Sequence, residues 1–308
     1  MRRSGSYDEL SLVDHLASEL GVERRRPIRR VQHQVSGSSI SALRWGEEDP
    51  TLVLLHGGSL NAHSWDALLL LLDVPALAID LPGHGSSSWF PEPLYTPAAV
   101  AAAVAPAIAE LAPAAAAVVG HSLGGLAALA LAAGHPDHVR RLVVVDATPG
   151  STPDRSRDIL ELVRTSEFPS LEAVVDHVAG SQPRRTRASL RRSVLHNARA
   201  RPDGRWTWRH DTRVHPTQDR WEVMFRELPR GWAHVAAVRC PTLLVRGARS
   251  PIVLDDDVTR YRELLPALRV VLIPDAGHNI QGQQPASLGH AIMSFLEGTG
   301  WRVDEVAP

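Results

Sequence analysis

The 308-residue chain is predicted to be an α/β protein with a mostly parallel, doubly wound sheet, an N-terminal β-hairpin and a helical insertion. Three observations predict this class. Short, almost continuously apolar segments alternate with helical segments, which is the pattern of a parallel sheet covered on both faces. Two segments of alternating polarity precede them. The regular alternation then stops at residues 149–236 and resumes afterwards.

The first elements precede the parallel sheet. Residues 8–20 carry apolar side chains three and four apart, which predicts a helix, and Gly21 is a residue typical of a helix end. Segments 29–35 and 39–45 alternate between polar and apolar residues on either side of Ser36-Gly37-Ser38. Two such segments around a short polar turn indicate a β-hairpin.

The remaining elements alternate along the chain. Thr96-Pro97 marks one helix start well, because threonine caps a helix and proline suits its first position. Strands are predicted over residues 51–56, 76–80, 116–121, 141–146, 242–246 and 269–273. Helices are predicted over residues 64–72, 97–112, 123–133, 256–265 and 285–297.

The segment 149–236 breaks this order. It is rich in arginine and in helical patterns, it contains no strong strand, and it is too long for a plain connection between two core elements. Its large aromatic side chains either line an apolar substrate pocket or form a small core of the insertion itself. These residues are Trp206, Trp208, Trp221, Phe225 and Trp232.

Composition limits the classes of partner and the compartment. A net charge of −1 argues against nucleic-acid and membrane partners, and the single Cys240 excludes an internal disulfide. The first residues contain no apolar stretch of the kind found in a signal peptide, so a cytoplasmic location is expected. The oligomeric state is not indicated by the sequence.

The most informative motif is Gly120-His121-Ser122-Leu123-Gly124. It follows an apolar strand and precedes a run of small residues suited to a helix, which is the setting of a nucleophilic serine on a sharp turn. The two glycines let neighbouring backbone pass without a Cβ clash. The turn also leaves the amide of Leu123 at a helix N-terminus, where it stabilises negative charge.

Four strand-then-loop motifs in this order resemble the α/β-hydrolase fold superfamily, in its serine hydrolase branch with a helical cap. They lie at residues 51–58, which end in His-Gly-Gly, 76–86, 118–125 and 271–278, which end in Asp-Ala-Gly-His. The resemblance extends from about Val31 to about Leu296.

The resemblance implies roles for five residues. Ser122 is the expected nucleophile, and His278, on the loop after the last apolar strand, is the expected base. The backbone amides of Leu123 and Gly58 are expected to form the oxyanion hole, with Ser59 as the neighbouring alternative to Gly58.

The resemblance also implies the domain organisation. Residues 1–148 and 237–308 are expected to form the hydrolase core, and residues 149–236 a helical cap, or lid, over the active site. Asp80 and Ser86 are similar to family residues that brace the loops of the site.

The catalytic acid departs from the family pattern. Relatives usually carry aspartate in a Gly-x-x-Asp arrangement after the strand equivalent to 242–246, and here Ser250 stands at that place. One replacement is Asp146, which ends the preceding strand. The other is one of Asp255, Asp256 and Asp257, which also fit the capping of a helix start. A serine–histidine pair without an acid is a third alternative.

These observations predict a cofactor-free serine hydrolase that cleaves a carboxylic ester through an acyl-enzyme. Alternatives are a carbon–carbon bond hydrolase or thioesterase on the same scaffold, and a hydrolase-like small-molecule binding protein that has lost turnover. The expected substrate is a small molecule with an apolar acyl group or a ring. No metal site is expected, because His135 and His138 lack further ligands at suitable spacing.

Overall fold

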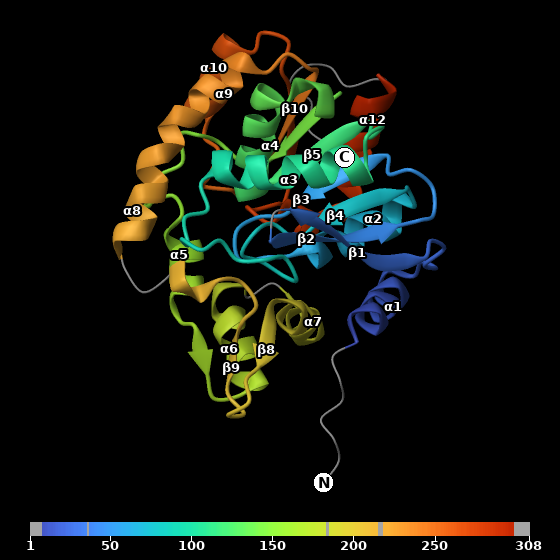
Figure 1. The fold of residues 1–308 in the computed structure, drawn as a ribbon, viewed down its shortest axis with the longest axis vertical. Coiled ribbons are helices and arrows are strands. Elements are labelled where there is room, and N and C mark those ends of the chain that lie inside the picture. Colours follow the sequence, from blue (N-terminus) through green and yellow to red (C-terminus); the bar gives the residue numbers. More distant parts are fainter. Residues whose placement is uncertain (1–7, 36, 183–184, 215–217, 299–308) are drawn as a thin grey trace.

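A central sheet with helices on both faces organises the molecule (Figure 1). The computed structural model describes residues 8–35, 37–182, 185–214 and 218–298. Within these ranges the large sheet has eight strands in the order β1-β2-β4-β3-β5-β6-β10-β11. Their bounds are β1 Ile28–Val35, β2 Ser38–Trp45, β3 Leu52–Leu55, β4 Ala76–Ile79, β5 Ala117–His121, β6 Leu142–Val145, β10 Thr242–Gly247 and β11 Arg269–Ile273.

The direction of the strands agrees with the prediction. β1 pairs antiparallel with β2, and β2 pairs antiparallel with β4, whereas every pairing from β4 to β11 is parallel. The predicted hairpin and the predicted mostly parallel sheet are therefore confirmed, although its turn residue Ser36 lies outside the described residues.

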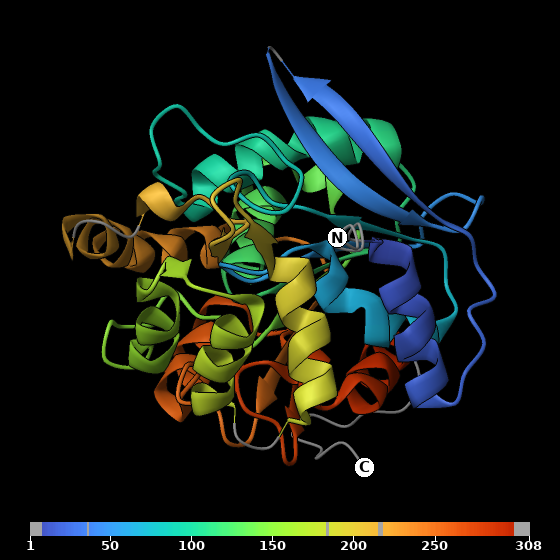
Figure 2. The ribbon, with the colours of Figure 1, turned by 90° about the horizontal axis from the view of Figure 1, so that it is seen from below.

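Helices cover the two faces of this sheet in separate layers (Figure 2). On one face lie α3 (Pro97–Leu111), α4 (Leu123–Gly134), α9 (Gly231–Ala237) and α10 (Asp255–Leu264), and on the other lie α1 (Glu9–Leu20), α2 (Asp66–Leu72) and α12 (Pro285–Glu297). Strand β3 illustrates why both faces are apolar, because Val53 and Leu55 join the first layer and Leu52 and Leu54 the second. Of the helices in the described residues, none combines the length and apolarity needed to cross a membrane.

Two predicted helix boundaries are explained by their caps. The Asp8 carboxylate accepts from the amides of Leu10 and Ser11 at the start of α1, and Gly21 ends it in the left-handed conformation, with φ of 67°. Thr96 accepts from the amide of Ala99 at the start of α3. Such caps replace hydrogen bonds that the first turn of a helix cannot make internally.

The insertion contains strands as well as helices. Its elements are α5 Arg157–Arg164, β7 Glu167–Phe168, α6 Leu171–Ser181, α7 Arg187–Asn197, β8 Ala198–Ala200, β9 Trp206–Trp208 and α8 Gln218–Glu227. The strands form a small antiparallel sheet in the order β7-β9-β8. The sequence predicted no strong strand here, because segments of two or three residues are too short to show a period of two.

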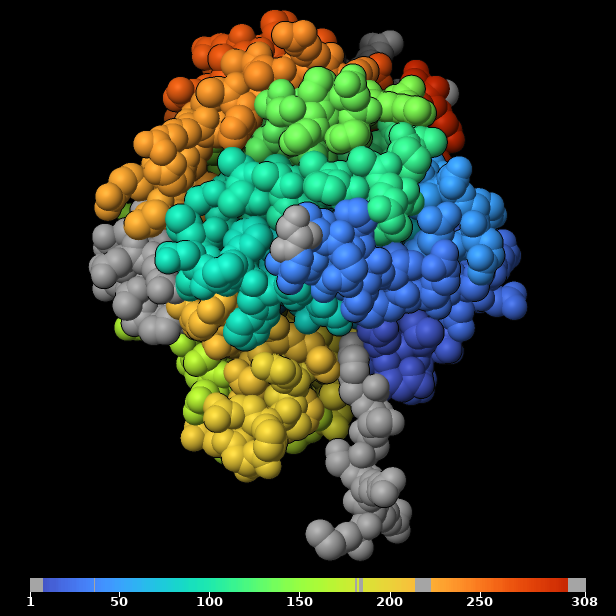
Figure 3. All heavy atoms as spheres, viewed as in Figure 1, coloured from blue at the N-terminus to red at the C-terminus, as the bar shows by residue number. Residues whose placement is uncertain are grey.

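The insertion divides into two regions in space. Helices α6 and α7 and strands β8 and β9 form a lobe at the foot of the molecule, whereas α8 and α9 run along the flank of the core (Figures 1 and 3). The lobe has its own apolar cluster, which includes Phe168, Val175 and Trp208. Trp232 of α9 instead packs in the main core against Tyr261.

These positions bear on the predicted aromatic lining. Trp208 and Trp232 are 5% and 7% exposed, so both are core residues, and Trp206 packs against the lobe's cluster. The side chain of Trp221 lies outside the described residues.

The lobe is held on the core by polar contacts. The Asn61 side-chain amide donates to the backbone carbonyl of His196 at 2.7 Å, and the Asp211 amide donates to the carbonyl of Gly83 at 2.7 Å. The Tyr95 hydroxyl also donates to the Asp211 carboxylate at 2.7 Å. The lobe therefore rests on the loops that follow β3 and β4, at the carboxyl edge of the sheet.

Replacement of Gly124 tests the closest packing in the core. A Cβ at this position would overlap the backbone carbonyl oxygens of Leu55 and His56, which cannot move without breaking the sheet. Gly124→Ala is therefore expected to lower the free energy of unfolding by about 3 kcal/mol or more, the upper range for overpacking. Urea denaturation measures this loss.

Gly134→Ala, at the other end of the same helix, is the matched control. A Cβ there meets no heavy atom within 4 Å, and alanine favours helix more than glycine does. Its stability is expected to equal or exceed that of the parent protein. Equal stability of the two variants would contradict the packing argument.

Candidate active site

Ser122 lies on a strained turn between β5 and α4. Its φ and ψ are 52° and −119°, outside the regions that residues with a side chain ordinarily adopt. The Ser122 amide donates to the carbonyl of Val145 on β6 at 3.1 Å. Two residues later, the Gly124 amide donates to the carbonyl of His56 at 3.1 Å. These bonds hold the turn between the two neighbouring strands.

His278 lies on the loop after β11 and faces this serine. Its Nε2 is 3.1 Å from the Ser122 Oγ. His121 holds this loop, because its Nε2–H donates to the backbone carbonyl of His278 at 2.8 Å. The side-chain amide of Gln281 donates to the Nδ1 of His121 at 3.1 Å. Burial lowers the pKa of His121 well below its ordinary value, so its ring is neutral and each nitrogen has a defined role.

Asp146 completes a line of three hydrogen-bonded side chains. It directly follows β6, and its Oδ2 is 2.7 Å from the Nδ1 of His278. The carboxylate is fully buried and receives two further donors from the loop after β10, the amide of Gly247 on Oδ1 at 3.1 Å and the hydroxyl of Ser250 on Oδ2. Ser250, which occupies the usual place of the family acid, thus contacts the carboxylate from the loop after the neighbouring strand.

The three other candidate acids lie at the start of α10. The exposed Asp255 pairs with Arg246 at 2.5 Å, and Asp256 is also exposed. Asp257 is buried, but it accepts from the Leu254 amide at 2.9 Å and from the Arg155 guanidinium at 2.6 Å. The structure thus brings Asp146 to His278 and uses the first turn of α10 for capping and ion pairing.

The segments that carry the two predicted oxyanion donors pack against each other. A Cβ at Gly57 would lie 3.2 Å from the Cβ of Ser122, so the loop after β3 presses against the nucleophile turn. The nearest heavy atom to a Cβ at Gly58 would be the Cδ2 of Leu123, at 4.0 Å. Leu123 is the first residue of α4, where no carbonyl of the helix is available to its amide. The alternative, Ser59, donates its amide to the Nε2 of His84 at 3.0 Å.

Two neutral histidines brace these loops. His56 donates from Nδ1 to the Gly57 carbonyl at 2.7 Å and accepts at Nε2 from the Leu81 amide at 2.9 Å. His84 donates from Nδ1 to the Pro82 carbonyl at 2.9 Å. Burial lowers the pKa of both imidazoles, so both stay neutral and accept through Nε2.

Asp80 connects the loops to the N-terminal part of the chain. Its carboxylate accepts from the Ala62 amide at 2.8 Å and from the Ser86 amide at 3.0 Å, as expected for a bracing residue. The Arg30 guanidinium binds the same carboxylate at 2.7 Å and Glu9 of α1 at 2.6 Å. Arg30 and Glu9 carry no signal in the sequence, because they are ordinary charged residues on a strand and a helix.

A pocket of about 180 Å³ opens beside α4. Its lining includes Leu126 and Leu129 of α4, Pro149, and Leu228 from the flank of the insertion. Leu126 lies one helical turn after Ser122, and its amide donates to the Ser122 carbonyl at 3.0 Å. The lining of the pocket on α4 therefore begins one helical turn beyond Ser122, and its wall is mainly apolar.

Candidate metal ligands occur together at one place in the described part of the chain. His63, Asp66 and His196 place one ligand atom each within 4.8 Å of the others. The pair considered from the sequence, His135 and His138, is instead two stacked rings with centroids 5.9 Å apart on a surface turn.

Known proteins match this chain along most of its length. The model of the "Alpha/beta hydrolase family" matches residues 52–288. Esterase Rv0045c of Mycobacterium tuberculosis is 38% identical over 94% of this chain and 96% of its own. The mouse sn-1-specific diacylglycerol lipase ABHD11 is 28% identical over 80% of this chain and 81% of its own.

A solved structure agrees with these matches. The structure of esterase Rv0045c from work on its transition metal inhibition superposes with a TM-score of 0.83, at 38% identity, over 96% of this chain and 100% of the other. Sequence and fold therefore give the same assignment over the whole core. The chain belongs to the alpha/beta hydrolase family.

Proposed function

We propose that this protein is a serine hydrolase that cleaves carboxylic esters, with Ser122 as nucleophile, His278 as base and Asp146 as acid. The observation that carries the proposal is the continuous line Ser122–His278–Asp146, with separations of 3.1 and 2.7 Å. The 38% identity to a protein named as an esterase supports the ester as the bond that is cleaved.

The first half of the reaction forms an acyl-enzyme. The Ser122 oxygen attacks the ester carbonyl carbon while its proton passes to the Nε2 of His278. The tetrahedral intermediate collapses, the bond to the alkoxy group breaks, and His278 returns the proton to the leaving alcohol. In the second half, a water molecule loses a proton to His278 and attacks the acyl carbon. The bond from this carbon to the Ser122 oxygen then breaks, and His278 returns the proton to that oxygen as the acid is released.

The amides of Gly58 and Leu123 are the proposed donors to the negative oxygen of each intermediate. The packing of the Gly58 loop against the start of α4 and the position of Leu123 at the helix N-terminus support this role, because fixed dipoles stabilise developing charge without reorganisation. The amide of Ser59 is already directed to His84, which favours Gly58 as the second donor.

Ser250 and Gly247 are proposed to position the acid. A buried carboxylate is stable only when its oxygens are hydrogen-bonded or paired. The Gly247 amide and Ser250 hydroxyl satisfy the oxygens of Asp146 and fix its plane toward the Nδ1 of His278. Ser250, at the family's usual acid position, thus supplies a neutral hydrogen-bond donor. The carboxylate itself is that of Asp146, which follows the neighbouring strand.

Residues 149–236 are proposed to act as a cap that selects the substrate. The contacts of Asn61 and Asp211 with the core support this, since they seat the lobe on the loops around Ser122. The pocket lined by Leu126 and Leu228 suits an apolar acyl group. Small esters of apolar acids are therefore the proposed substrates.

Removal of the nucleophile or the base tests the reaction class. Ser122→Ala and His278→Ala are each expected to lower kcat for a p-nitrophenyl ester by at least about 10⁴-fold, and the double variant is expected to be little worse, because the two residues act as a unit. Ser122→Ala is also expected to abolish labelling by a fluorophosphonate probe.

The exposed Ser18 on α1 provides the control, and Ser18→Ala is expected to keep both turnover and labelling. If the fluorophosphonate probe did not label the parent protein and the protein still bound esters, the result would support a small-molecule binding protein without turnover.

Substitution of the acids separates Asp146 from the α10 carboxylates. Asp146→Asn is expected to lower kcat by about 10³- to 10⁴-fold, because the amide cannot compensate the charge of the imidazolium. Asp257→Asn is expected to keep kcat and to lose about 1 kcal/mol of stability through its helix cap. Initial rates and urea denaturation measure the two effects.

Ser250→Ala tests the positioning of the same carboxylate. Loss of one donor is expected to lower kcat about 10-fold with little change in KM and to shift the acidic limb of the pH–rate profile, while Ser250→Thr restores the donor. Full activity of Asp146→Asn would remove Asp146 from the mechanism.

Filling the pocket tests the acyl preference. Leu228→Trp is expected to raise KM for an octanoyl ester at least about 10-fold while leaving an acetyl ester unchanged, because only the longer chain reaches the pocket. Leu254→Trp, at a 39% exposed position outside the pocket lining, is the control. An equal effect of Leu228→Trp on both esters would place the acyl chain elsewhere.

A further inference from the structure

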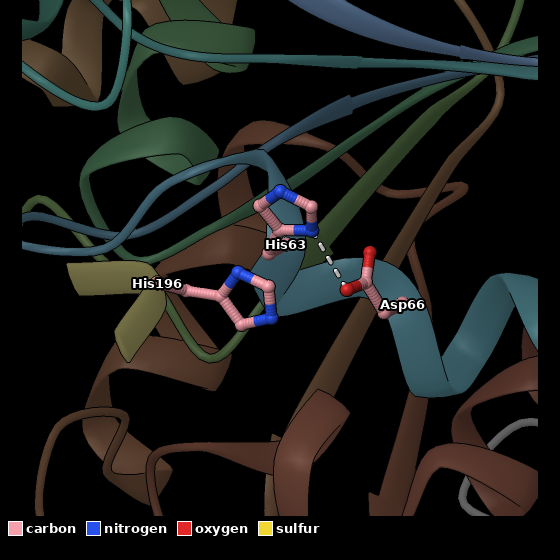
Figure 4. A group of neighbouring side chains, drawn as sticks. All are labelled: His63, Asp66 and His196. Carbon is pink, nitrogen blue, oxygen red and sulfur yellow. Dashed lines mark hydrogen bonds and ion pairs between the residues drawn. The ribbon is translucent and has the colours of Figure 1, made fainter. Parts of the chain in front are cut away.

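Three buried side chains from distant parts of the sequence face one another beside the active-site loops (Figure 4). His63 lies on the short 3-10 helix Ala62–Trp65, and Asp66 is the first residue of α2. His196 comes from α7 of the insertion. Their exposed fractions are 8%, 2% and 5%, and the ligand atoms of the three lie within 4.8 Å of one another.

The donor set has the composition of a transition-metal site. Two imidazoles and one carboxylate are ligands that Zn²⁺ and neighbouring divalent ions prefer, at bond lengths of about 2.0–2.2 Å. The Nδ1 of His63 and the Oδ2 of Asp66 are already 2.8 Å apart. A metal ion between them requires only a small separation of the two groups.

One oxygen of this carboxylate lacks a protein partner. The Asp66 Oδ1 is buried and receives no hydrogen bond from the described residues. A buried carboxylate oxygen without a donor costs free energy. A cation coordinated by both oxygens of Asp66 satisfies Oδ1. This unpartnered oxygen therefore points to a ligand independently of the grouping of the three side chains.

A further carboxylate holds the ring of His63 in place. The Nε2 of His63 lies 3.2 Å from the Oε2 of Glu9. A histidine that binds a metal ion through one nitrogen commonly donates from the other to a carboxylate, which orients the ring.

We propose that His63, Asp66 and His196 form a binding site for one divalent transition-metal ion of the Zn²⁺ or Co²⁺ type. The ion replaces the proton between His63 and Asp66, and that proton is released to solvent. In the arrangement of Figure 4 the two imidazole rings are stacked, with centroids 3.9 Å apart and planes 21° apart. Binding therefore requires His196 to turn its ring until its lone pair also points at the ion.

The occupied site links the insertion to the core. His63 and Asp66 belong to the core and His196 to the insertion. Asn61 lies between them, because its side chain accepts from the His63 amide at 3.0 Å and donates to the His196 carbonyl at 2.7 Å. Metal binding is therefore expected to raise the thermal stability of the folded protein, independently of any ester hydrolysis.

Sequence spacing gave no hint of this site. In a sequence, a zinc motif is recognised by two pairs of ligands, in which the members of each pair are a few residues apart and a loop separates the pairs. Here two ligands are three residues apart and the third follows 130 residues later, on a part of the chain that only the fold brings near. The expectation that no metal site exists rested on the pair His135 and His138 alone.

Direct binding tests the proposal. Full-length protein freed of metal with a chelator and dialysed is titrated with ZnCl₂ and, separately, with CoCl₂. We expect one ion to bind per chain and Tm to rise. We also expect the bound Co²⁺ to show a visible absorption band typical of an ion with a low coordination number. Crystals soaked in ZnCl₂ are expected to show one anomalous peak bounded by the side chains of His63, Asp66 and His196.

Variants locate the ion. His196→Gln and Asp66→Asn are each expected to weaken Zn²⁺ binding at least about 100-fold. The double variant His135→Gln/His138→Gln and the variant His278→Gln are the matched controls, and both are expected to bind as the parent does. They remove the stacked surface pair and the active-site imidazole without altering the proposed ligands.

Two outcomes overturn the proposal. One is unchanged Zn²⁺ affinity in His196→Gln, and the other is an anomalous peak at His278 or at the surface pair with none at the proposed site. Circular dichroism shows whether each variant is folded. If His196→Gln or Asp66→Asn fails to fold, the anomalous map of the unmodified protein decides alone.

Discussion

The close crossing of two backbones beneath Ser122 determines most of this active site. The α4 backbone at Gly124 lies against the carbonyls of Leu55 and His56, with no room for a Cβ. This contact bends the chain sharply at Ser122 and aligns the start of α4 with the loop after β3. Ser122, the N-terminus of α4 and the loop after β3 therefore come together through one steric constraint, and the sheet supplies the rigidity that maintains it.

The acid shows how the same geometry accepts a different sequence. β6 and β10 are neighbouring parallel strands, so the residues that follow them end at the same edge of the sheet. A carboxylate from either strand reaches the same imidazole. In this chain Asp146 provides the carboxylate and Ser250 a hydrogen bond to it, which keeps a buried charge solvated by protein dipoles. The pairing explains why a serine at position 250 is compatible with a complete line of side chains.

The sequence was sufficient for the parts of the fold that local patterns determine. Buried strands, capped helices and the turn at Ser122 depend on neighbours along the chain, and the structure contains them within one or two residues of the predicted bounds. The choice between Asp146 and the α10 carboxylates depended on which strands lie side by side, so sequence left it open. The contacts of Arg30 with Asp80 and of His63 with His196 join segments far apart in the chain, and no local pattern predicts them. The short strands of the insertion form only because they pair with one another.

Asn61 connects the insertion to the loop segment beside the candidate active site. One side chain fixes both the 3-10 helix after the Gly58 loop and the end of α7, through hydrogen bonds at its two ends. A displacement of the lobe therefore pulls on the same peptide segment that carries the proposed oxyanion donor. If residues 149–236 act as the proposed cap, a substrate that shifts the lobe therefore also shifts the loop that carries the amide of Gly58.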